Sequence, residues 1–446
     1  MEYVKEINAV VNRFIWGRGM LAVFLFVGVM FTVRTGFFQF TKVRIWLGKT
    51  MGEMFRDRRV RRTEEEHSIS QFQSFCTALA ATLGTGNITG VAAALIAGGP
   101  GAIFWMWVSA FLGMMTIYAE NLLGIRYRYK NRKGEWVGGA MVYIERGLGC
   151  KWLAVLFAVF CIFASFGMGN MTQANSMASG LKESLSIPPF ITGAVVTLVV
   201  AAVILGGVKR IAAVTEKVVP FVALFYMLVL IHFRAEVPGA VRMIFEEAFR
   251  MKAVGGGVIG YGIRQAMKIG ISRGVFSNEA GLGSSVMAHA ASDVKSPAIQ
   301  GMWGILEVFI DTIVVCTMTA LVILSSGVYK PQVYLSNMAR GIENVDGTTL
   351  TGEAFSTVIP FGDKFLAISI VLFAFATMVG WAYFGAFLYK MVYVLMILPG
   401  CMMTPHLAWE VADTFNGLMA LPNMTALILL SGEVVYITKG YIKNKQ

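Results

Sequence analysis

Two segments of the chain place glycine, asparagine and hydroxyl residues near the middle of an apolar stretch. The first runs from Thr82 to Gly90 and the second from Ser277 to Ser285. An unsatisfied backbone group in hydrocarbon is costly, so an irregular backbone persists there only where it lines a cavity. Paired, glycine-interrupted segments in corresponding positions of two halves indicate the binding site of an inverted-repeat transporter. We therefore predict two broken helices around a ligand.

The chemistry of such breaks suits a zwitterion. Free N–H groups at the start of a second half-helix attract a carboxylate, and the helix dipole adds to this attraction. Free carbonyls at the end of a first half-helix suit an ammonium group or a sodium ion. The side-chain oxygens of Thr85, Asn87 and Asn278 could complete a hard-cation site, which requires oxygen ligands.

Simpler interpretations compete with each of these assignments. Glycines in a membrane helix also allow close helix packing. The spacing of Gly84, Gly86 and Gly90 superficially resembles a dinucleotide loop, but the third glycine is misplaced and no strand precedes it. Glu279, an acid within a crossing, is either functional or paired with Arg273 or another helix.

Two other groups of residues favour structural interpretations. Glu307 and Asp311 are four residues apart on one predicted helical face, and we interpret them as structural polar contacts. Trp381 and Tyr383 could line a pocket, although aromatic residues in membrane helices are more often packing residues.

The surrounding sequence consists of apolar runs that can position these breaks in a membrane. The chain has 446 residues, 56% hydrophobic and only 14% charged, against about 25% charged in soluble domains. A crossing needs roughly 20 apolar residues, and we count about eleven crossings. The expected runs are Phe14 to Val33, two within Ser68 to Ala119, Trp152 to Leu181, Ser184 to Val208, Val218 to Phe233, Gly255 to Ala291, Ile299 to Tyr329, Phe365 to Tyr389, Met391 to Trp409 and Thr414 to Tyr436.

Charge distribution predicts the orientation. Nine basic residues lie between Arg34 and Ser68 and seven between Arg126 and Lys151, and such loops stay in the cytoplasm. The N-terminus is then outside and the C-terminus inside, in the plasma (inner) membrane. The dense charge run from Arg56 to Glu66 is interpreted as a solvated interfacial helix, with a lipid head-group role as the alternative.

Counting crossings also relates the two breaks. The first opens the second crossing and the second lies in the seventh, so five crossings separate them and two five-helix units would have opposite orientation. We expect an N-terminal helix and basic loop over residues 1–66, an inverted-repeat core over 67–440 and a tail over 441–446.

Composition also excludes several classes of function. The formal charge of +12 lies in short loops without the interleaved aromatic residues of a nucleic-acid site, so no nucleic-acid partner is expected. The five cysteines form no CxxC pair and the four histidines no paired ligand spacing, so neither a zinc site nor a disulfide framework is indicated. No catalytic constellation is visible, and we expect neither an enzyme nor a cofactor. A channel would need a continuous polar pore.

Longer strings of residues resemble the alanine/glycine:cation symporter family, a branch of the amino-acid–polyamine–organocation transporters. The resemblance covers most of the chain. The matching strings are Leu83 to Asn87 continuing through Gly98 to Trp107, Ala164 to Ser176, Arg273 to Gly281, and Gly380 to Gly385.

The resemblance implies an all-α membrane protein with a leucine-transporter-type fold: two inverted five-helix repeats after one extra N-terminal helix. It implies sodium-coupled import of alanine or glycine by alternating access, with the bilayer and a sodium ion as partners and a monomer as the expected unit. Proton coupling to another small amino acid is the alternative. The substrate would contact Thr85, Gly86, Asn87, Asn170, Gln173, Phe276, Ser277, Asn278 and Trp381.

The same resemblance places one sodium ion between the first broken helix, at Gly84, and the pair Ala376-Thr377 on a later helix. Here the sequence departs from the family, which usually has serine where Ala376 stands and glutamate where Ala386 stands. Ala140 and Val142 also replace a usual proline and tyrosine. We therefore expect weak sodium binding, with Thr377 as the remaining hydroxyl ligand.

Overall fold

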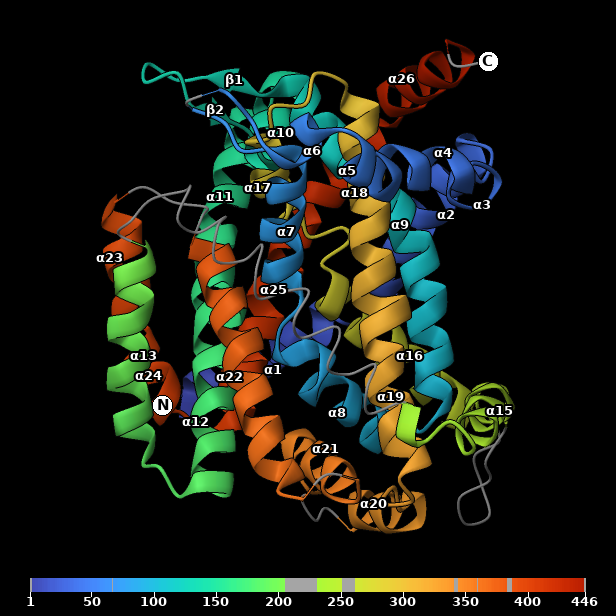
Figure 1. Cartoon of the computed structure of the whole chain (residues 1–446), viewed down its shortest axis with the longest axis vertical. Coiled ribbons are helices and arrows are strands. Elements are labelled where there is room, and N and C mark those ends of the chain that lie inside the picture. Colours follow the sequence, from blue (N-terminus) through green and yellow to red (C-terminus); the bar gives the residue numbers. More distant parts are fainter. Residues whose placement is uncertain are drawn as a thin grey trace.

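A computed structural model describes residues 2–65, 67–204, 231–250, 261–340, 344–358, 360–382 and 387–444. Most of these residues are helical, and the long helices run between two opposite ends of the molecule (Figure 1). A short antiparallel hairpin joins β1 (Tyr129–Lys130) to β2 (Trp136–Val137), with Tyr129 opposite Val137.

The helices divide at the hairpin. Before it lie α1 (Glu2–Ile15), α2 (Arg18–Arg34), α3 (Phe38–Thr41), α4 (Val43–Leu47), η1 (Gly48–Gly52), α5 (Glu53–Arg56), α6 (Arg58–Arg61), α7 (Gln71–Thr82), η2 (Thr85–Asn87), α8 (Thr89–Gly98) and α9 (Gly101–Tyr127). After it lie α10 (Ala140–Leu148), α11 (Lys151–Phe166), η3 (Gly167–Met171), α12 (Thr172–Leu185), α13 (Pro189–Ile204), α15 (Val237–Ala248), α16 (Tyr261–Asn278), α17 (Val286–Ala290), α18 (Pro297–Val308), η4 (Phe309–Cys316), α19 (Thr317–Ser325), α20 (Pro331–Ala339), α21 (Gly347–Ser356), α22 (Gly362–Trp381), α23 (Phe387–Leu395), α24 (Ile397–Met402), α25 (Pro405–Leu429) and α26 (Ser431–Lys443).

Among the described residues, four continuous helical segments are long and apolar enough to cross a membrane, and two bent pairs raise the number to six. The bent pairs are α7 with α8, at 60°, and α25 with α26, at 59°. The predicted crossing Val218 to Phe233 lies mostly outside the described residues, as do Gly255 to Gly260. The number eleven and the two five-helix repeats therefore remain predictions. The four continuous segments are Gly101–Tyr127, Lys151–Leu185, Pro297–Ser325 and Gly362–Trp381.

Some predicted boundaries were wrong. The first run is divided, because α1 ends at Ile15 and α2 begins at Arg18; a side chain at Gly17 would lie 2.9 Å from the Phe14 carbonyl. Near the C-terminus, the predicted crossing Met391 to Trp409 ends early. The helix stops at Met402 and α25 starts at Pro405, which suits a first helical turn because it lacks an N–H group.

Two π-helical segments, η3 and η4, interrupt the long helices. Each widens the turn and rotates the side chains that follow it, a feature often found at functional sites. Glu307 and Asp311, predicted to make structural polar contacts, have different partners. Glu307 bonds to His289 at 2.9 Å, whereas Asp311 contacts residues of the two breaks.

The basic loops predicted to be cytoplasmic lie at one end of the molecule. Helices α3 to α6, the hairpin, α10 and the C-terminal α26 gather there (Figure 1, top). Within this end Ile69, just before α7, forms a parallel bridge with Ser292, just after α17. Its N–H donates to the Ala291 carbonyl at 3.1 Å, and its carbonyl accepts from Asp293 at 3.0 Å.

Arg128 holds the same region in place. Its guanidinium donates to the carbonyls of Ala290, Ser292 and Val294 and lies 4.0 Å from the centre of the Trp136 ring. Burial lowers the pKa of this guanidinium to about 10, so it stays charged near neutral pH. The hairpin is thereby fixed to the segment that follows the second break.

Candidate functional site

The first predicted break is present between α7 and α8. Helix α7 begins with a capping box, in which Ser70 accepts from the Gln73 N–H. It ends at Thr82, and a single 3₁₀ turn, η2, precedes α8. The Gly84 N–H donates to the Asn87 side-chain oxygen at 3.0 Å, and the Thr85 N–H donates to Gln173 Oε1 at 3.1 Å. The N–H groups of Gly84 and Thr85, which have no acceptor within a helix, are therefore bonded to neutral amide oxygens.

Gly84 is required at this turn by close approach. A β-carbon there would lie 2.7 Å from Thr377 Oγ1 and 3.0 Å from Gln173 Oε1. The adjacent Thr85 hydroxyl is buried and has no hydrogen-bond partner among the described residues. Because an unpaired buried hydroxyl is costly, this oxygen is available to a ligand.

The second predicted break follows α16. That helix ends at Asn278, and α17 begins only at Val286. Between them Glu279, Gly281 and Gly283 adopt positive φ angles of 57°, 94° and 77°. For Glu279 such an angle is uncommon and requires support from its surroundings.

The two breaks meet at Asp311. The Asn87 side-chain N–H₂ donates to Ser277 Oγ at 3.0 Å and to Asp311 Oδ1 at 2.7 Å. Ser277 Oγ donates to Asp311 Oδ2 at 2.8 Å. All three side chains are buried. A carboxylate on η4 thus joins η2 to the end of α16.

Asp311 was not among the predicted site residues. The sequence signal that could have identified it is an acid within an apolar run. The π-helical segment that carries Asp311 is not visible in the hydrophobic periodicity. Thr312 also donates to Asp311 Oδ2, at 2.7 Å, and accepts from Asn278 at 3.1 Å. The donors that surround Asp311 are therefore neutral hydroxyl and amide groups.

Thr377 of α22 contacts the first break at the carbonyl groups that end α7. Its Oγ1 is 3.0 Å from the Ala80 carbonyl oxygen and 3.1 Å from that of Leu83. One hydroxyl proton can satisfy only one of the two carbonyls at a time. Ala376 is also buried and has no hydroxyl to offer.

Aromatic side chains lie around the breaks. Phe276 would be 3.6 Å from a β-carbon at Gly86, and its ring is 5.1 Å from that of Trp409. The indole N–H of Trp381 donates to Glu279 at 3.2 Å. Trp381 therefore supports the second break directly, which its predicted role in the pocket did not include.

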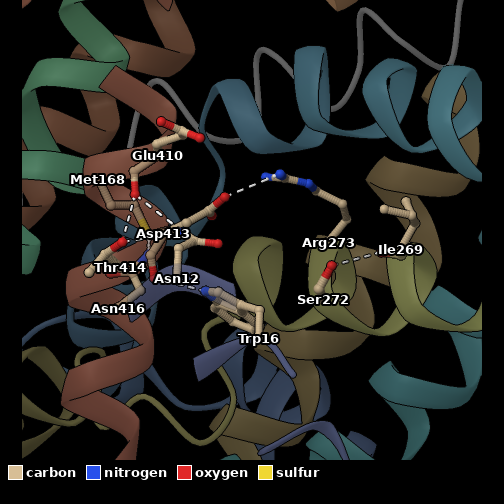
Figure 2. A network of polar contacts seen from close by, with 10 residues as sticks. All are labelled: Asn12, Trp16, Met168, Ile269, Ser272, Arg273, Glu410, Asp413, Thr414 and Asn416. Atoms are coloured by element: carbon tan, nitrogen blue, oxygen red, sulfur yellow. Dashed lines mark hydrogen bonds and ion pairs between the residues drawn. The ribbon is translucent and has the colours of Figure 1, made fainter. Parts of the chain in front are cut away.

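An ion pair lies beyond Phe276, toward the end of the molecule with α15 and α20. Arg273 contacts Asp413 at 3.2 Å and lies over the rings of Phe276 and Trp409. Figure 2 shows Arg273 reaching from α16 to α25, and Trp16, which directly follows α1, donating to the Asp413 backbone carbonyl at 2.9 Å. Glu279 is consequently not the partner of Arg273.

Further carboxyl groups surround the second break. Glu279 accepts from Ser284 as well as from Trp381. Glu120 of α9 accepts from Asn423, whose side chain also donates to the Gly281 carbonyl at 2.9 Å. The other carboxyl oxygen of Glu120, Oε2, is buried without a hydrogen-bond partner among the described residues. No set of three or more His, Cys, Asp or Glu residues in the described part of the chain is arranged to hold a metal ion.

Most of the predicted site residues lie at these two breaks. Gln173 reaches η2, whereas within the described residues no hydrogen bond joins Asn170 to either break, and the side-chain oxygen of Asn170 is buried without a partner there. The π-helical segment η3 rotates Asn170 toward Tyr393, whose backbone carbonyl accepts from its side chain. The residues brought together are Gly84, Thr85, Gly86, Asn87, Gln173, Phe276, Ser277, Asn278 and Thr377.

Sequence similarity to known transporters extends over almost the whole chain. The chain is 42% identical over 461 residues to a sodium/alanine symporter of Methanococcus maripaludis, covering 99% of this chain and 98% of the relative. It is 34% identical over 464 residues to a probable sodium/glutamine symporter of Bacillus subtilis, covering 100% and 92%. A manganese transporter of Eremococcus coleocola, solved in complex with an aromatic bis-isothiourea substituted compound, has a similar fold, with a TM-score of 0.51 and 14% identity over 85% of this chain and 81% of that chain.

The family assignment rests on the whole sequence. The model described as "Sodium:alanine symporter family" matches residues 1–446. Its members are transporters and not enzymes, as we predicted. The chain therefore belongs to the sodium:alanine symporter family and is a sodium-coupled, multi-pass membrane symporter of amino acids.

Proposed function

We propose that this symporter imports alanine or glycine together with sodium. The observation that carries the proposal is the junction of the two breaks, where Asn87 bonds to Ser277 at 3.0 Å and both contact Asp311. A ligand at this junction touches both halves of the core at once. Binding there can favour one arrangement of the halves over another, as alternating access requires.

The substrate carboxylate would bind at η2. The groups that now accept from the N–H groups of this turn are neutral amide oxygens: that of Gln173 accepts from the Thr85 N–H, and that of Asn87 accepts from the Gly84 N–H. An anion makes stronger hydrogen bonds to N–H groups than a neutral amide does. The unpaired Thr85 hydroxyl would add a further donor. Together these groups favour an α-carboxylate at the start of α8.

The surroundings favour a small side chain. Phe276 lies against Gly86, Trp381 is fully buried, and the space at Gly84 is filled by Gln173 and Thr377. This crowding supports alanine or glycine over a larger amino acid. Trp381→Ala should admit leucine, provided the second break survives the loss of the indole bond to Glu279. Strong leucine transport by the unmodified protein would overturn the small-substrate proposal.

Two positions can hold the coupling cation, and both supply the oxygen ligands that sodium requires. The first combines Thr377 Oγ1 with the carbonyls of Ala80 and Leu83. The second is the Asp311 carboxylate, with the hydroxyl oxygens of Ser277 and Thr312 beside it. Asp311 also favours a second candidate function, proton coupling, because only neutral groups donate to its carboxylate.

The basic end of the molecule would face the cytoplasm. Excess lysine and arginine in short loops marks that side, and these loops share one end with α26 (Figure 1). This orientation makes the Arg273–Asp413 side the outer entrance. The proposed setting is the plasma membrane, with one chain as the transporting unit.

Reconstituted vesicles test the proposal. Purified protein should accumulate labelled alanine or glycine against its gradient when sodium is higher outside. A proton gradient imposed without sodium tests the second candidate in the same vesicles. Equal uptake with and without either gradient would disprove coupling, and accumulation driven by protons alone would replace sodium with protons.

A further inference from the structure

The segment between the first membrane helix and the first break is strongly basic. We call residues 42–62 the basic segment. Its eight lysine and arginine residues against two acids give a formal charge of +6. The cations are Lys42, Arg44, Lys49, Arg56, Arg58, Arg59, Arg61 and Arg62, and the acids are Glu53 and Asp57.

The short helices of this segment enclose an open groove of about 730 Å³, lined in part by Arg44, Arg56 and Arg59. All three side chains are exposed. Arg59 contacts Asp57 at 3.2 Å, but within the described residues Arg44 and Arg56 have no ion-pair partner. Of the charged side chains that line the groove, Lys49 pairs with Glu53 and Arg59 with Asp57, so within the described residues Arg44 and Arg56 carry its unpaired positive charge.

Large apolar side chains are exposed just before the basic segment and within it. Phe37 and Phe40 are about half exposed, at 49% and 50%, and Phe55 is 73% exposed. Phe55 directly precedes Arg56 in the chain. Aromatic residues beside basic residues are typical of segments that lie in the membrane interface, where the rings enter the lipid and the cations stay at the head groups.

We infer that the basic segment binds the phosphate head group of an anionic phospholipid in this groove. Guanidinium groups recognise phosphate oxygens by paired hydrogen bonds, and clusters of four to eight basic residues directly beside a membrane helix favour anionic lipid. Inorganic phosphate would satisfy the charges but not the exposed phenylalanines. A phospholipid satisfies both, because its acyl chains cover Phe37, Phe40 and Phe55.

The groove is connected to the moving parts of the proposed mechanism. Trp46 in α4 packs against Phe309 at the start of η4, with ring centres 6.3 Å apart. Ser70, the N-cap of α7, donates to the Arg61 carbonyl at 2.9 Å. A lipid held by the basic segment thus fixes the base of α7 and the helix that carries Asp311.

Lipid binding can be measured without transport. Protein in neutral detergent is titrated with short-chain phosphatidylglycerol or phosphatidylcholine while thermal unfolding is followed, because a ligand of the folded state raises its unfolding temperature. We expect phosphatidylglycerol to raise that temperature and phosphatidylcholine not to. The variant Arg44→Gln/Arg56→Gln/Arg59→Gln should bind about a hundredfold more weakly, at roughly fivefold per charge.

A matched control removes three exposed charges elsewhere at the same end of the molecule. Arg132→Gln/Lys133→Gln/Lys151→Gln should keep the full phosphatidylglycerol response. An equal loss of response in both triple variants would show only general charge attraction and would overturn the site. An equal response to inorganic phosphate, or no response of the unmodified protein to phosphatidylglycerol, would overturn the lipid assignment.

Uptake in vesicles then tests the connection to α7. Sodium-driven uptake should be several-fold faster in vesicles that contain phosphatidylglycerol than in pure phosphatidylcholine, and the groove variant should lose this difference. Because phosphatidylglycerol binding is measured separately, a failure of sodium coupling leaves the lipid result intact. Unchanged lipid dependence in the groove variant would disprove a role of this groove in transport.

Discussion

The two breaks solve the same backbone problem with different partners. At the first, the N–H groups of Gly84 and Thr85 are satisfied by the neutral amides of Asn87 and Gln173. At the second, three positive φ angles lie among carboxyl groups, with Glu279 bound to Trp381 and Ser284 and with Glu120 on the other side. The first break is a single turn, whereas the second extends over residues 279–285.

Because of this difference, we expect the first break to bind the ligand and the carboxyl groups around the second break to hold its backbone in place. A neutral amide exchanges its hydrogen bond for one to a ligand at little cost, since the net value of such a bond is about 1 kcal/mol. A buried carboxyl group that holds a strained loop is far harder to displace, because removal leaves backbone groups unpaired. Variants at the first break should therefore change affinities, and variants behind the second should change stability.

The largest expected effect is at Thr377. Thr377→Ala removes the hydroxyl oxygen that lies 3.0 Å from the Ala80 carbonyl oxygen and 3.1 Å from that of Leu83, and sodium-driven uptake should nearly disappear. Thr377→Ser is the control and should retain uptake. Ala376→Ser should lower the half-saturating sodium concentration about tenfold, as expected for one added oxygen ligand. If Thr377→Ala is silent and Ala376→Ser leaves sodium dependence unmoved, sodium does not bind here.

A smaller effect is expected at the junction itself. Asp311→Asn replaces an acceptor of bonds from Asn87, Ser277 and Thr312. The half-saturating cation concentration should rise about tenfold to a hundredfold, since a bond to a charged group contributes about 1.5–3 kcal/mol. Glu307→Gln changes an equally buried acid that contacts His289 instead. Identical shifts in both variants would indicate a general charge effect and not a site at Asp311.

Gln173 and Asn170 give a sharper contrast within one helical segment. Gln173→Ala removes the acceptor of the Thr85 N–H. The concentration of alanine for half-maximal uptake should rise about tenfold or less, in line with the loss of one hydrogen bond. Asn170→Ala removes a bond to Tyr393 and should leave that concentration unchanged. Equal effects of the two substitutions would contradict the role given to η3.

The smallest effect on transport affinity is expected behind the second break. Glu120→Ala removes the acceptor of the bond from Asn423, the residue that also donates to the Gly281 carbonyl, and the free energy of unfolding should fall by about 1–3 kcal/mol. Thermal unfolding in detergent measures the loss, and Gly90→Ala, whose added methyl meets only the rim of Trp409 at 3.9 Å, is the matched control. Weaker alanine binding by a fully stable Glu120→Ala protein would remove the distinction between the breaks.

Sequence reasoning located both breaks, because glycine and asparagine inside an apolar run are a strong local signal. It also placed Gln173 and Thr377 beside the first break, through the family resemblance. It did not place Asp311 or separate Asn170 from Gln173. In both cases a π-helical segment shifts the register by a fraction of a turn, and nothing in the hydrophobic periodicity marks that shift.

Helix boundaries near the C-terminus were also missed. Pro405 and Pro422 interrupt the last two predicted crossings, but only the first begins a helix, whereas α25 continues through the second. Such a choice depends on packing against other helices, which re-satisfies the backbone group freed by a proline. The sequence shows where the prolines are, but not which helices pack against them.

The parallel bridge between Ile69 and Ser292 has a mechanical consequence. It ties the residue before α7 to the segment after α17, so the two broken helices share one backbone anchor at the basic end of the molecule. Arg128 strengthens that anchor through carbonyl oxygens, which carry no titratable proton. The ends of α7 and α17 at the basic end of the molecule are therefore tied together, and we expect a movement of one of these half-helices to move the other.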